Sequence, residues 1–165
     1  MSVQTELNWI AEARKYVGVK EIPGPKNNPV IQGWLRSLKA WWSDDATSWC
    51  GTYTAQVLQA CKLSYPKEWY RAKAYLSMPV KLDKPAYGCI VVFDRAGGGH
   101  VGFVVGKDRF DNLMVLGGNQ GDMVSIKPFS RDRVVGYRWP NLYPTNGRFK
   151  LPLLDSDGKV SENEA

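Results

Sequence analysis

The spacing of apolar residues divides this chain into a first part with helical periodicity and a second part with short apolar runs. The spacing predicts helices over residues 5–17, 29–38, 50–63 and 66–76, and the runs predict strands over residues 89–93, 101–105, 113–116, 123–126 and 134–139. Short connectors between the runs favour antiparallel neighbours. The pattern predicts an α+β protein with N-terminal helices packed on a C-terminal antiparallel sheet of about five strands.

Capping residues support three of the predicted helix starts. Thr5 can cap the first helix, and Asn28 followed by Pro29 is typical of a cap and a first helical turn. Ser48 or Thr47 can cap the third helix, because a hydroxyl oxygen accepts from an N–H group that the helix start leaves unpaired. These caps place the start of the third helix close to residue 50.

The length and composition of the chain suit one globular domain. Its 165 residues are enough for a single core, and 44% of them are hydrophobic. We expect one domain over residues 1–142 and an irregular extension over residues 143–165, disordered from about residue 156. No apolar run reaches about 18 residues, so we expect no stable membrane insertion. We also expect a monomer.

The net charge is unevenly distributed along the chain. It is +6 in total, while residues 151–165 carry −3, so the first 150 residues carry +9. A basic body suits an acidic partner such as nucleic acid, anionic lipid or the bacterial envelope, although solubility accounts for it equally well. The basic residues are scattered rather than clustered in one segment, which argues against nucleic acid.

A thiol at a predicted helix start is the main candidate for chemistry. The unpaired N–H groups there would favour the thiolate of Cys50 over its thiol. His100, the single histidine, follows three glycines at a predicted strand start. It would take the thiol proton and later give it to a leaving amine. A free cysteine is more often a small buried hydrophobe, which is how we interpret Cys61 and Cys89.

Four short motifs occur in a fixed order: Trp49-Cys50, Pro85-x-x-Gly88 followed by Ile90 to Phe93, Gly99-His100-Val101-Gly102, and Gly117-Gly118-Asn119. Together they resemble the papain-like peptidoglycan hydrolases of the CHAP and NlpC types, including a subgroup common in phages and prophages. The resemblance covers roughly residues 7–139. One departure is Gly88-Cys89, where NlpC sequences usually have Gly-Asp.

The resemblance implies that Asn119 orients the ring of His100. A strand that stays regular would also place Asn119 on the same face as Val115 and Gly117. The alternative is that residues 119–122 only form a turn, a common role for these residue types. Gln120 and Asp122 are weaker candidates for the orienting group, because they lie further into the turn.

The resemblance also bears on the oxyanion and on metals. The backbone N–H of Cys50 is the expected first oxyanion donor. The second donor is undecided between Tyr53, Trp42 and Gln56. We expect no metal and no cofactor, because the cysteines and the histidine are too widely spaced for zinc. Asp44-Asp45 is only weakly similar to the acidic calcium loop found in some CHAP domains.

The resemblance implies a cysteine peptidase or amidase that cleaves an amide bond of peptidoglycan through an acyl-thioester. A phage lysis enzyme, or endolysin, is the expected setting. The alternatives are a non-catalytic wall-binding module and an interbacterial amidase toxin, and the bond that is cut remains open. Residues 1–20 lack a secretory signal. We therefore expect synthesis in the bacterial cytoplasm and action on the wall after release by a holin or delivery by secretion machinery.

Three tryptophans precede or begin the predicted nucleophile helix. Trp41, Trp42 and Trp49 can form part of the core, as large aromatic side chains usually do. Rings beside a site can instead hold the face of a sugar or a peptide. The sequence favours the core for these residues but does not decide between the two.

Overall fold

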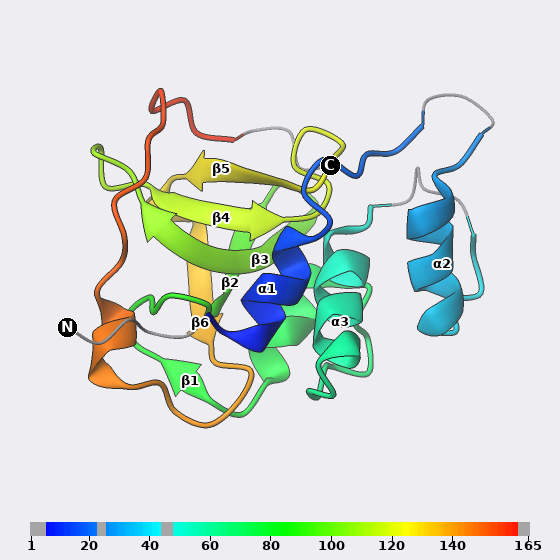
Figure 1. Cartoon of the computed structure of the whole chain (residues 1–165), viewed down its shortest axis with the longest axis horizontal. Coiled ribbons are helices and arrows are strands. Elements are labelled where there is room, and N and C mark those ends of the chain that lie inside the picture. The colour runs from blue at the N-terminus through cyan, green and yellow to red at the C-terminus, as the bar shows by residue number, and fades with distance from the viewer. Residues whose placement is uncertain (1–5, 23–25, 44–47, 162–165) are drawn as a thin grey trace.

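The computed structural model describes residues 6–22, 26–43 and 48–161. It confirms the predicted α+β class: helices pack on an antiparallel sheet of six strands over these residues (Figure 1). The helices are α1 (Asn8–Arg14), α2 (Pro29–Ser37) and α3 (Cys50–Ala60). The strands are β1 (Lys81–Leu82), β2 (Ile90–Arg95), β3 (Gly98–Lys107), β4 (Leu113–Gly117), β5 (Ser125–Phe129) and β6 (Val134–Arg138).

The order of strands places β3 near the middle of the sheet. The order is β1-β6-β2-β3-β4-β5, and every neighbouring pair is antiparallel. Five strands correspond to the predicted runs, and the two-residue β1 at the edge is additional. The run over residues 123–126 was predicted too early, because β5 begins two residues after Met123 and continues to Phe129. Helix α3 packs on β3, while α1 and α2 pack on α3.

The start of α2 and the length of α1 can be compared with the predictions. Asn28 caps α2 as predicted, its side-chain oxygen accepting from the N–H of Val30 at 2.8 Å, and Pro29 is the first helical residue. Helix α1 is shorter than predicted, because residues after Arg14 form turns. Thr5, its predicted cap, lies outside the described residues.

Helix α3 is enclosed on all sides by the rest of the protein. Its residues from Cys50 to Leu58 are buried. Two hydroxyl groups tie neighbouring elements to backbone carbonyls: Tyr53 donates to Ala13 at 2.7 Å, and Tyr75 donates to Gly51 at 2.8 Å. Such buried and satisfied bonds fix the position of the helix start relative to α1 and to the sheet.

Within the described residues no side chain caps α3, so the predicted cap by Ser48 is wrong. The residue that precedes the helix is Trp49, which makes no capping bond. The hydroxyl oxygen of Ser48 instead accepts from Asn119 Nδ2 at 3.5 Å. Thr47, the other predicted cap, lies outside the described residues. The N–H groups of the first turn of α3 are therefore not used by a cap from Trp49 or Ser48.

The helix predicted over residues 66–76 is also wrong. Turns occupy the first part of this segment, and a short 3-10 helix, η1 (Ala72–Ser77), occupies the second. The buried residues Trp69, Ala72 and Tyr75 of the segment 66–76 are spaced by three. That spacing matches the three residues per turn of a 3-10 helix as well as one face of an α-helix. The apolar pattern alone could not separate the two.

The C-terminal extension packs along the end of β3. The N–H of Lys107 donates to the carbonyl of Pro152 at 2.9 Å, and the carbonyl of Lys107 accepts from Leu154 at 2.8 Å. Further along, Ser156 Oγ donates to Asp108 Oδ2 at 2.7 Å, and the N–H of Ser161 donates to a β5 carbonyl. These contacts involve residues 152–161, and disorder from about residue 156 stays a prediction. Two more 3-10 helices are η2 (Arg131–Arg133) and η3 (Asn146–Phe149).

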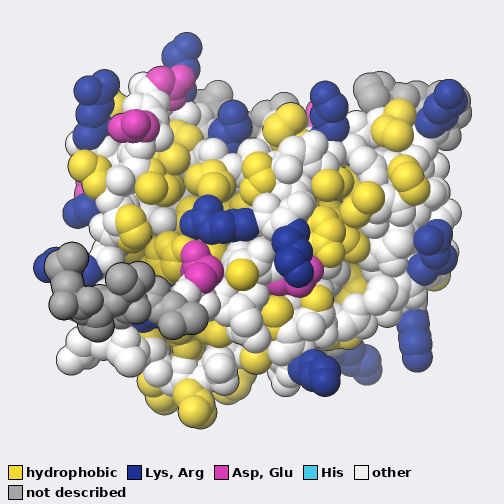
Figure 2. Space-filling model, viewed as in Figure 1, with side chains coloured by type: hydrophobic (Ala, Val, Ile, Leu, Met, Phe, Trp, Pro, Cys, Tyr) yellow, Lys and Arg dark blue, Asp and Glu magenta, His cyan; other side chains and the backbone are white. Residues whose placement is uncertain are grey.

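The surface carries basic side chains in scattered positions. Figure 2 shows Lys and Arg side chains spread over this face of the molecule, with fewer Asp and Glu side chains between them. Among the described residues, no helix has both the length and the apolar character needed to cross a membrane.

Candidate active site

The structure brings Cys50 and His100 together where α3 meets β3. Cys50 is the first residue of α3, and His100 lies near the start of β3. Burial by itself would raise the pKa of the Cys50 thiol. A hydrogen bond to His100 and the charge of His100 outweigh burial, with help from the backbone N–H of Val101 and the positive charge of Arg95, so the pKa is lowered. The thiol is therefore set up to ionise more readily than an ordinary cysteine.

A glutamine holds the other side of the imidazole. Nε2 of His100 lies 2.9 Å from Oε1 of Gln120. The side-chain nitrogen of Gln120 donates to the carbonyls of Val115 at 3.1 Å and Ser125 at 2.9 Å. These two bonds fix the direction of the amide, so the atom that faces His100 is an acceptor. His100 must then donate through Nε2.

This arrangement assigns the proton on the imidazole ring. A neutral imidazole carries one N–H, and here the Nε2 position holds it. Nδ1 of His100 is buried and has no nitrogen or oxygen partner among the described residues. It is therefore the ring atom left for the thiol of Cys50, as a base that accepts a proton. Cys50 is only 3% exposed and His100 is fully buried, so the pair is screened from bulk water.

The predicted contact between Asn119 and His100 is not present, and Gln120 makes it instead. Strand β4 ends at Gly117, and Asn119 has φ of 60°, in the left-handed region. The alternation of side chains therefore stops two residues before Asn119, and the turn directs Gln120 to the imidazole. Asn119 reaches the other half of the site, where its Nδ2 lies 3.5 Å from Oγ of Ser48.

A glycine makes room for the Gln120 side chain. A Cβ atom added at Gly117 would collide with Oε1 of Gln120 and would lie 3.4 Å from Nε2 of His100. Any side chain at position 117 would therefore disturb the bond between Gln120 and His100. The pair Gly117-Gly118 was a signal in the sequence that something approaches the backbone closely at this point.

Aromatic rings that were not predicted as part of the site hold the plane of the His100 ring. The ring of Phe129 lies parallel to the imidazole, with an angle of 4° and centroids 5.2 Å apart. Phe93, the cross-strand neighbour of His100 in β2, lies 6.2 Å away and 4.7 Å from Phe129. Arg133 lies over the rings of both phenylalanines. The register of the hairpin formed by β2 and β3 could have predicted Phe93 as a neighbour of His100. Phe129 lies in β5, and no local pattern in the sequence predicts its contact with His100.

The start of α3 supplies the first expected oxyanion donor. The N–H of Cys50 belongs to the first turn, where no preceding helical carbonyl can accept it. Of the three candidates for the second donor, Tyr53 is excluded because its hydroxyl donates to Ala13. Gln56 lies six residues beyond Cys50 in α3, which is about 9 Å away along the helix axis. Trp42 stacks on Trp69 with an interplanar angle of 27°.

The other two cysteines lie in unreactive surroundings. Cys89 is fully buried, as predicted for a core thiol, and burial raises its pKa to about 12. Cys61 is half-buried, and burial is also the main cause that raises its pKa. Among the described residues, no three His, Cys, Asp or Glu side chains gather in a way that could hold a metal ion. Asp44 and Asp45 lie outside those residues.

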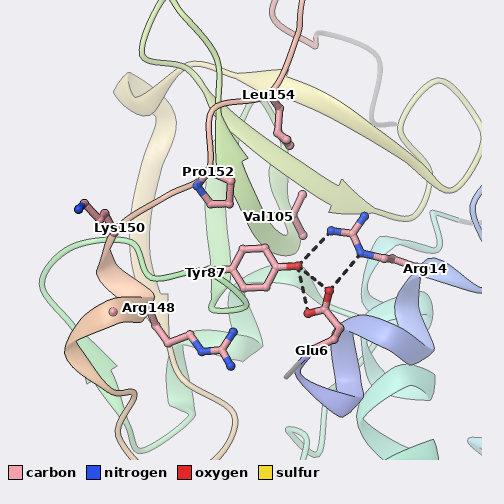
Figure 3. A pocket seen from close by; sticks show the side chains of 9 residues that line it. Glu6, Arg14, Tyr87, Val105, Arg148, Lys150, Pro152 and Leu154 are labelled. Carbon is pink, nitrogen blue, oxygen red and sulfur yellow. Dashed lines mark hydrogen bonds and ion pairs between the residues drawn. The ribbon is translucent and has the colours of Figure 1, made fainter. Parts of the chain in front are cut away.

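A cavity elsewhere in the protein lies away from this site. A space of about 350 Å³ lies between α1 and the C-terminal extension (Figure 3). At its edge the hydroxyl of Tyr87 donates to Glu6 and accepts from Arg14 at 3.0 Å. The remaining lining residues are Val105, Gly147, Arg148, Lys150, Pro152 and Leu154. Neither Cys50 nor His100 lines this cavity.

The fold and the paired side chains resemble a known class of protein. A cysteine at the start of a helix, packed against a histidine on an antiparallel sheet, is the arrangement of papain-like cysteine hydrolases. A comparison with protein families found that residues 42–119 match the CHAP domain. The matched segment contains Cys50 and His100 and ends one residue before Gln120. A comparison with curated proteins found no match.

The three cysteines should differ in the pH at which iodoacetamide labels them. We expect half-maximal labelling of Cys50 at a lower pH than that of Cys61, because only Cys50 has a lowered pKa and labelling requires the thiolate. Cys89 should stay unlabelled in the folded protein at neutral pH. Peptide mass spectrometry over a series of pH values measures all three together. Limited access of iodoacetamide to a thiol changes the maximal labelling rate but not the pH of half-maximal labelling.

The matched control for this experiment is His100→Ala. Removing the imidazole should move the labelling midpoint of Cys50 to higher pH, since His100 supplies the two largest effects that lower it. Coinciding midpoints for Cys50 and Cys61 in the parent protein would contradict an activated thiol.

Proposed function

We propose that this protein is a peptidoglycan hydrolase that cleaves an amide bond through a thioester on Cys50. The observation that carries the proposal is the buried pair of Cys50 and His100, with His100 held by Gln120 and the thiol pKa lowered. The match of residues 42–119 to the CHAP domain supports the substrate, because CHAP domains are generally cysteine and histidine dependent peptidases or amidases acting on peptidoglycan.

In the first half of the proposed reaction, the thiolate sulfur of Cys50 attacks the carbonyl carbon of the amide. A C–S bond forms and the carbonyl oxygen becomes an oxyanion, which the N–H of Cys50 can stabilise. The C–N bond then breaks, and Nδ1 of His100 gives its proton to the leaving nitrogen. The products of this half are a free amine and an acyl-thioester.

In the second half, water attacks the thioester carbonyl while Nδ1 of His100 accepts a proton from it. The C–S bond breaks, the thiolate returns and a carboxylic acid is released. Gln120 makes no bond to the substrate in this scheme. It keeps the N–H of His100 on Nε2, so that Nδ1 can accept and donate the proton at the reacting atoms.

Digestion of purified peptidoglycan tests the proposal. Mass spectrometry of the soluble fragments should show a new free amine and a new carboxyl group, both on stem-peptide residues if the bond lies within the peptide. If the bond joins peptide to sugar, the new carboxyl should be a free lactyl end and the new amine should be on the first residue of the stem peptide. Cys50→Ala protein serves as the control and should release neither. New reducing sugars in place of these ends, or wall binding without any product, would contradict the proposal.

The biological setting is a further part of the proposal. A phage lysis enzyme that reaches the wall through a holin is the setting that we favour, with delivery as an interbacterial toxin as the alternative. The scattered basic surface in Figure 2 suits approach to an anionic envelope in either setting.

A further inference from the structure

Four aromatic rings form a continuous platform, which we define as Trp41, Trp42, Trp69 and Tyr70. Trp41 meets Trp42 edge to face with centroids 5.1 Å apart, and Trp42 stacks on Trp69 at 5.6 Å. Tyr70 stands at 86° to both Trp42 and Trp69. The inner ring, Trp69, is buried, but Trp41 is 90% exposed and Tyr70 is 44% exposed. The sequence-based preference for a core role is therefore wrong for Trp41.

The platform adjoins the nucleophile through Gly51. A Cβ atom added at Gly51 would collide with the carbonyl oxygen of Trp69 and would lie 3.3 Å from the Cα atom of Tyr70. Gly51 directly follows Cys50 in α3. The backbone that carries Trp69 and Tyr70 thus touches the helix start that carries the thiol. A ligand on the exposed rings would extend from the site of bond cleavage.

The exposed rings form a contact surface rather than a part of the core. A tryptophan left 90% exposed keeps apolar area in water that burial would stabilise by roughly 25 cal/mol per Å². Trp41 is held by its edge-to-face contact with Trp42, so its remaining surface is presented to solvent in a defined direction. Exposed aromatic clusters of this kind mark binding surfaces.

We propose that the platform binds a saccharide unit of the glycan strand next to the amide bond that is cut. This inference rests on the proposed function. The face of a pyranose ring carries C–H groups and its edge carries hydroxyls, so it can stack on the electron-rich face of an indole while its hydroxyls stay in water. An open, exposed platform suits that ligand, whereas an apolar peptide side chain would need an enclosed pocket.

The test measures glycan binding separately from hydrolysis. The probe is a soluble chain of alternating N-acetylglucosamine and N-acetylmuramic acid without stem peptides, titrated by calorimetry into the Cys50→Ala protein. We expect binding, and we expect Trp41→Ala in the same background to weaken it by at least about tenfold. Phe110→Ala is the matched control, because Phe110 is 53% exposed but follows the opposite end of β3 from His100.

Hydrolysis by the active protein gives the second measurement. Trp41→Ala should raise KM on intact peptidoglycan with little change in kcat. If the bond that is cut lies within the peptide, this variant should also leave cleavage of glycan-free stem peptide unchanged. Trp41→Phe should restore part of the binding. Thermal unfolding of each variant shows that the fold is retained, as expected for a side chain that is 90% exposed.

The outcomes separate this inference from the proposed function. Glycan binding that Trp41→Ala weakens, in a protein that releases no wall fragments, would support the platform and overturn the hydrolase. Glycan binding that is absent or unchanged by Trp41→Ala, or an equal loss of activity on glycan-free peptide, would overturn the platform. Preferential binding of free stem peptide to the platform would overturn it as well.

Discussion

Replacing Cys50 with alanine should abolish peptidoglycan hydrolysis while leaving the fold intact. The proposed reaction forms its covalent bond at the sulfur of Cys50, and no other described cysteine has a lowered pKa. The smaller side chain fits the space, so stability should fall by no more than about 1–2 kcal/mol. Release of soluble fragments from purified wall, together with thermal unfolding, measures both effects.

The matched controls are the same substitution at the other two cysteines. Cys61→Ala and Cys89→Ala should keep the parent rate, although the fully buried Cys89 should show some loss of stability. The hydrolase proposal would have to be abandoned if Cys50→Ala cleared walls as well as the parent protein. It would be redirected if Cys61→Ala or Cys89→Ala were the inactive variant.

Replacing Gln120 with alanine should lower the turnover rate strongly, by about 100-fold, which is the lower range for losing an oriented acid–base group. The variant removes the acceptor 2.9 Å from His100 Nε2, so the proton is no longer held on that nitrogen. KM should change less than kcat, since Gln120 makes no bond to substrate in the proposed reaction. Steady-state rates on purified wall, measured over a range of pH, give both parameters.

Asn119→Ala is the control for that substitution. Asn119 contacts Ser48 rather than His100, so its variant should stay much closer to the parent rate. Gln120→Ala also leaves the carbonyls of Val115 and Ser125 without their donor, and its unfolding temperature should fall. The assignment fails if Asn119→Ala is the crippled variant and Gln120→Ala keeps the parent kcat.

The pair at the centre of the site could be predicted because each member has a local signal. Cys50 follows residues typical of a helix start, and His100 follows glycines at the start of an apolar run. These signals do not depend on how distant segments pack. The antiparallel sheet could be predicted for the same reason, since its short runs are divided by turn residues.

The orienting residue could not be predicted because it depends on one backbone conformation. Regular alternation from Val115 would point Asn119 along the same face as Gly117. The left-handed φ of Asn119 ends that alternation and brings Gln120 to the imidazole. Asparagine adopts this conformation more readily than most residues, but the sequence does not say that it does so here.

Packing between distant segments accounts for the remaining differences. Phe129 stacks on His100 only because β5 returns toward β2, which no local pattern shows. Residues 152–154 of the C-terminal extension pack on the end of β3 because Lys107 offers them backbone partners. In both cases the partner lies far away in the sequence, and tertiary contacts decide the conformation.

The division of the site between the two parts of the chain has a consequence for its timing during synthesis. Cys50 lies in the first third of the sequence, whereas His100, Gln120 and Phe129 all follow it by at least 50 residues. Translation adds about 5–20 residues per second, so the cysteine is made several seconds before the groups that activate it. Until they fold around it, Cys50 is an ordinary thiol. Under the proposed reaction, the growing chain therefore has no hydrolytic activity, and activity begins only when the sheet closes on the helix.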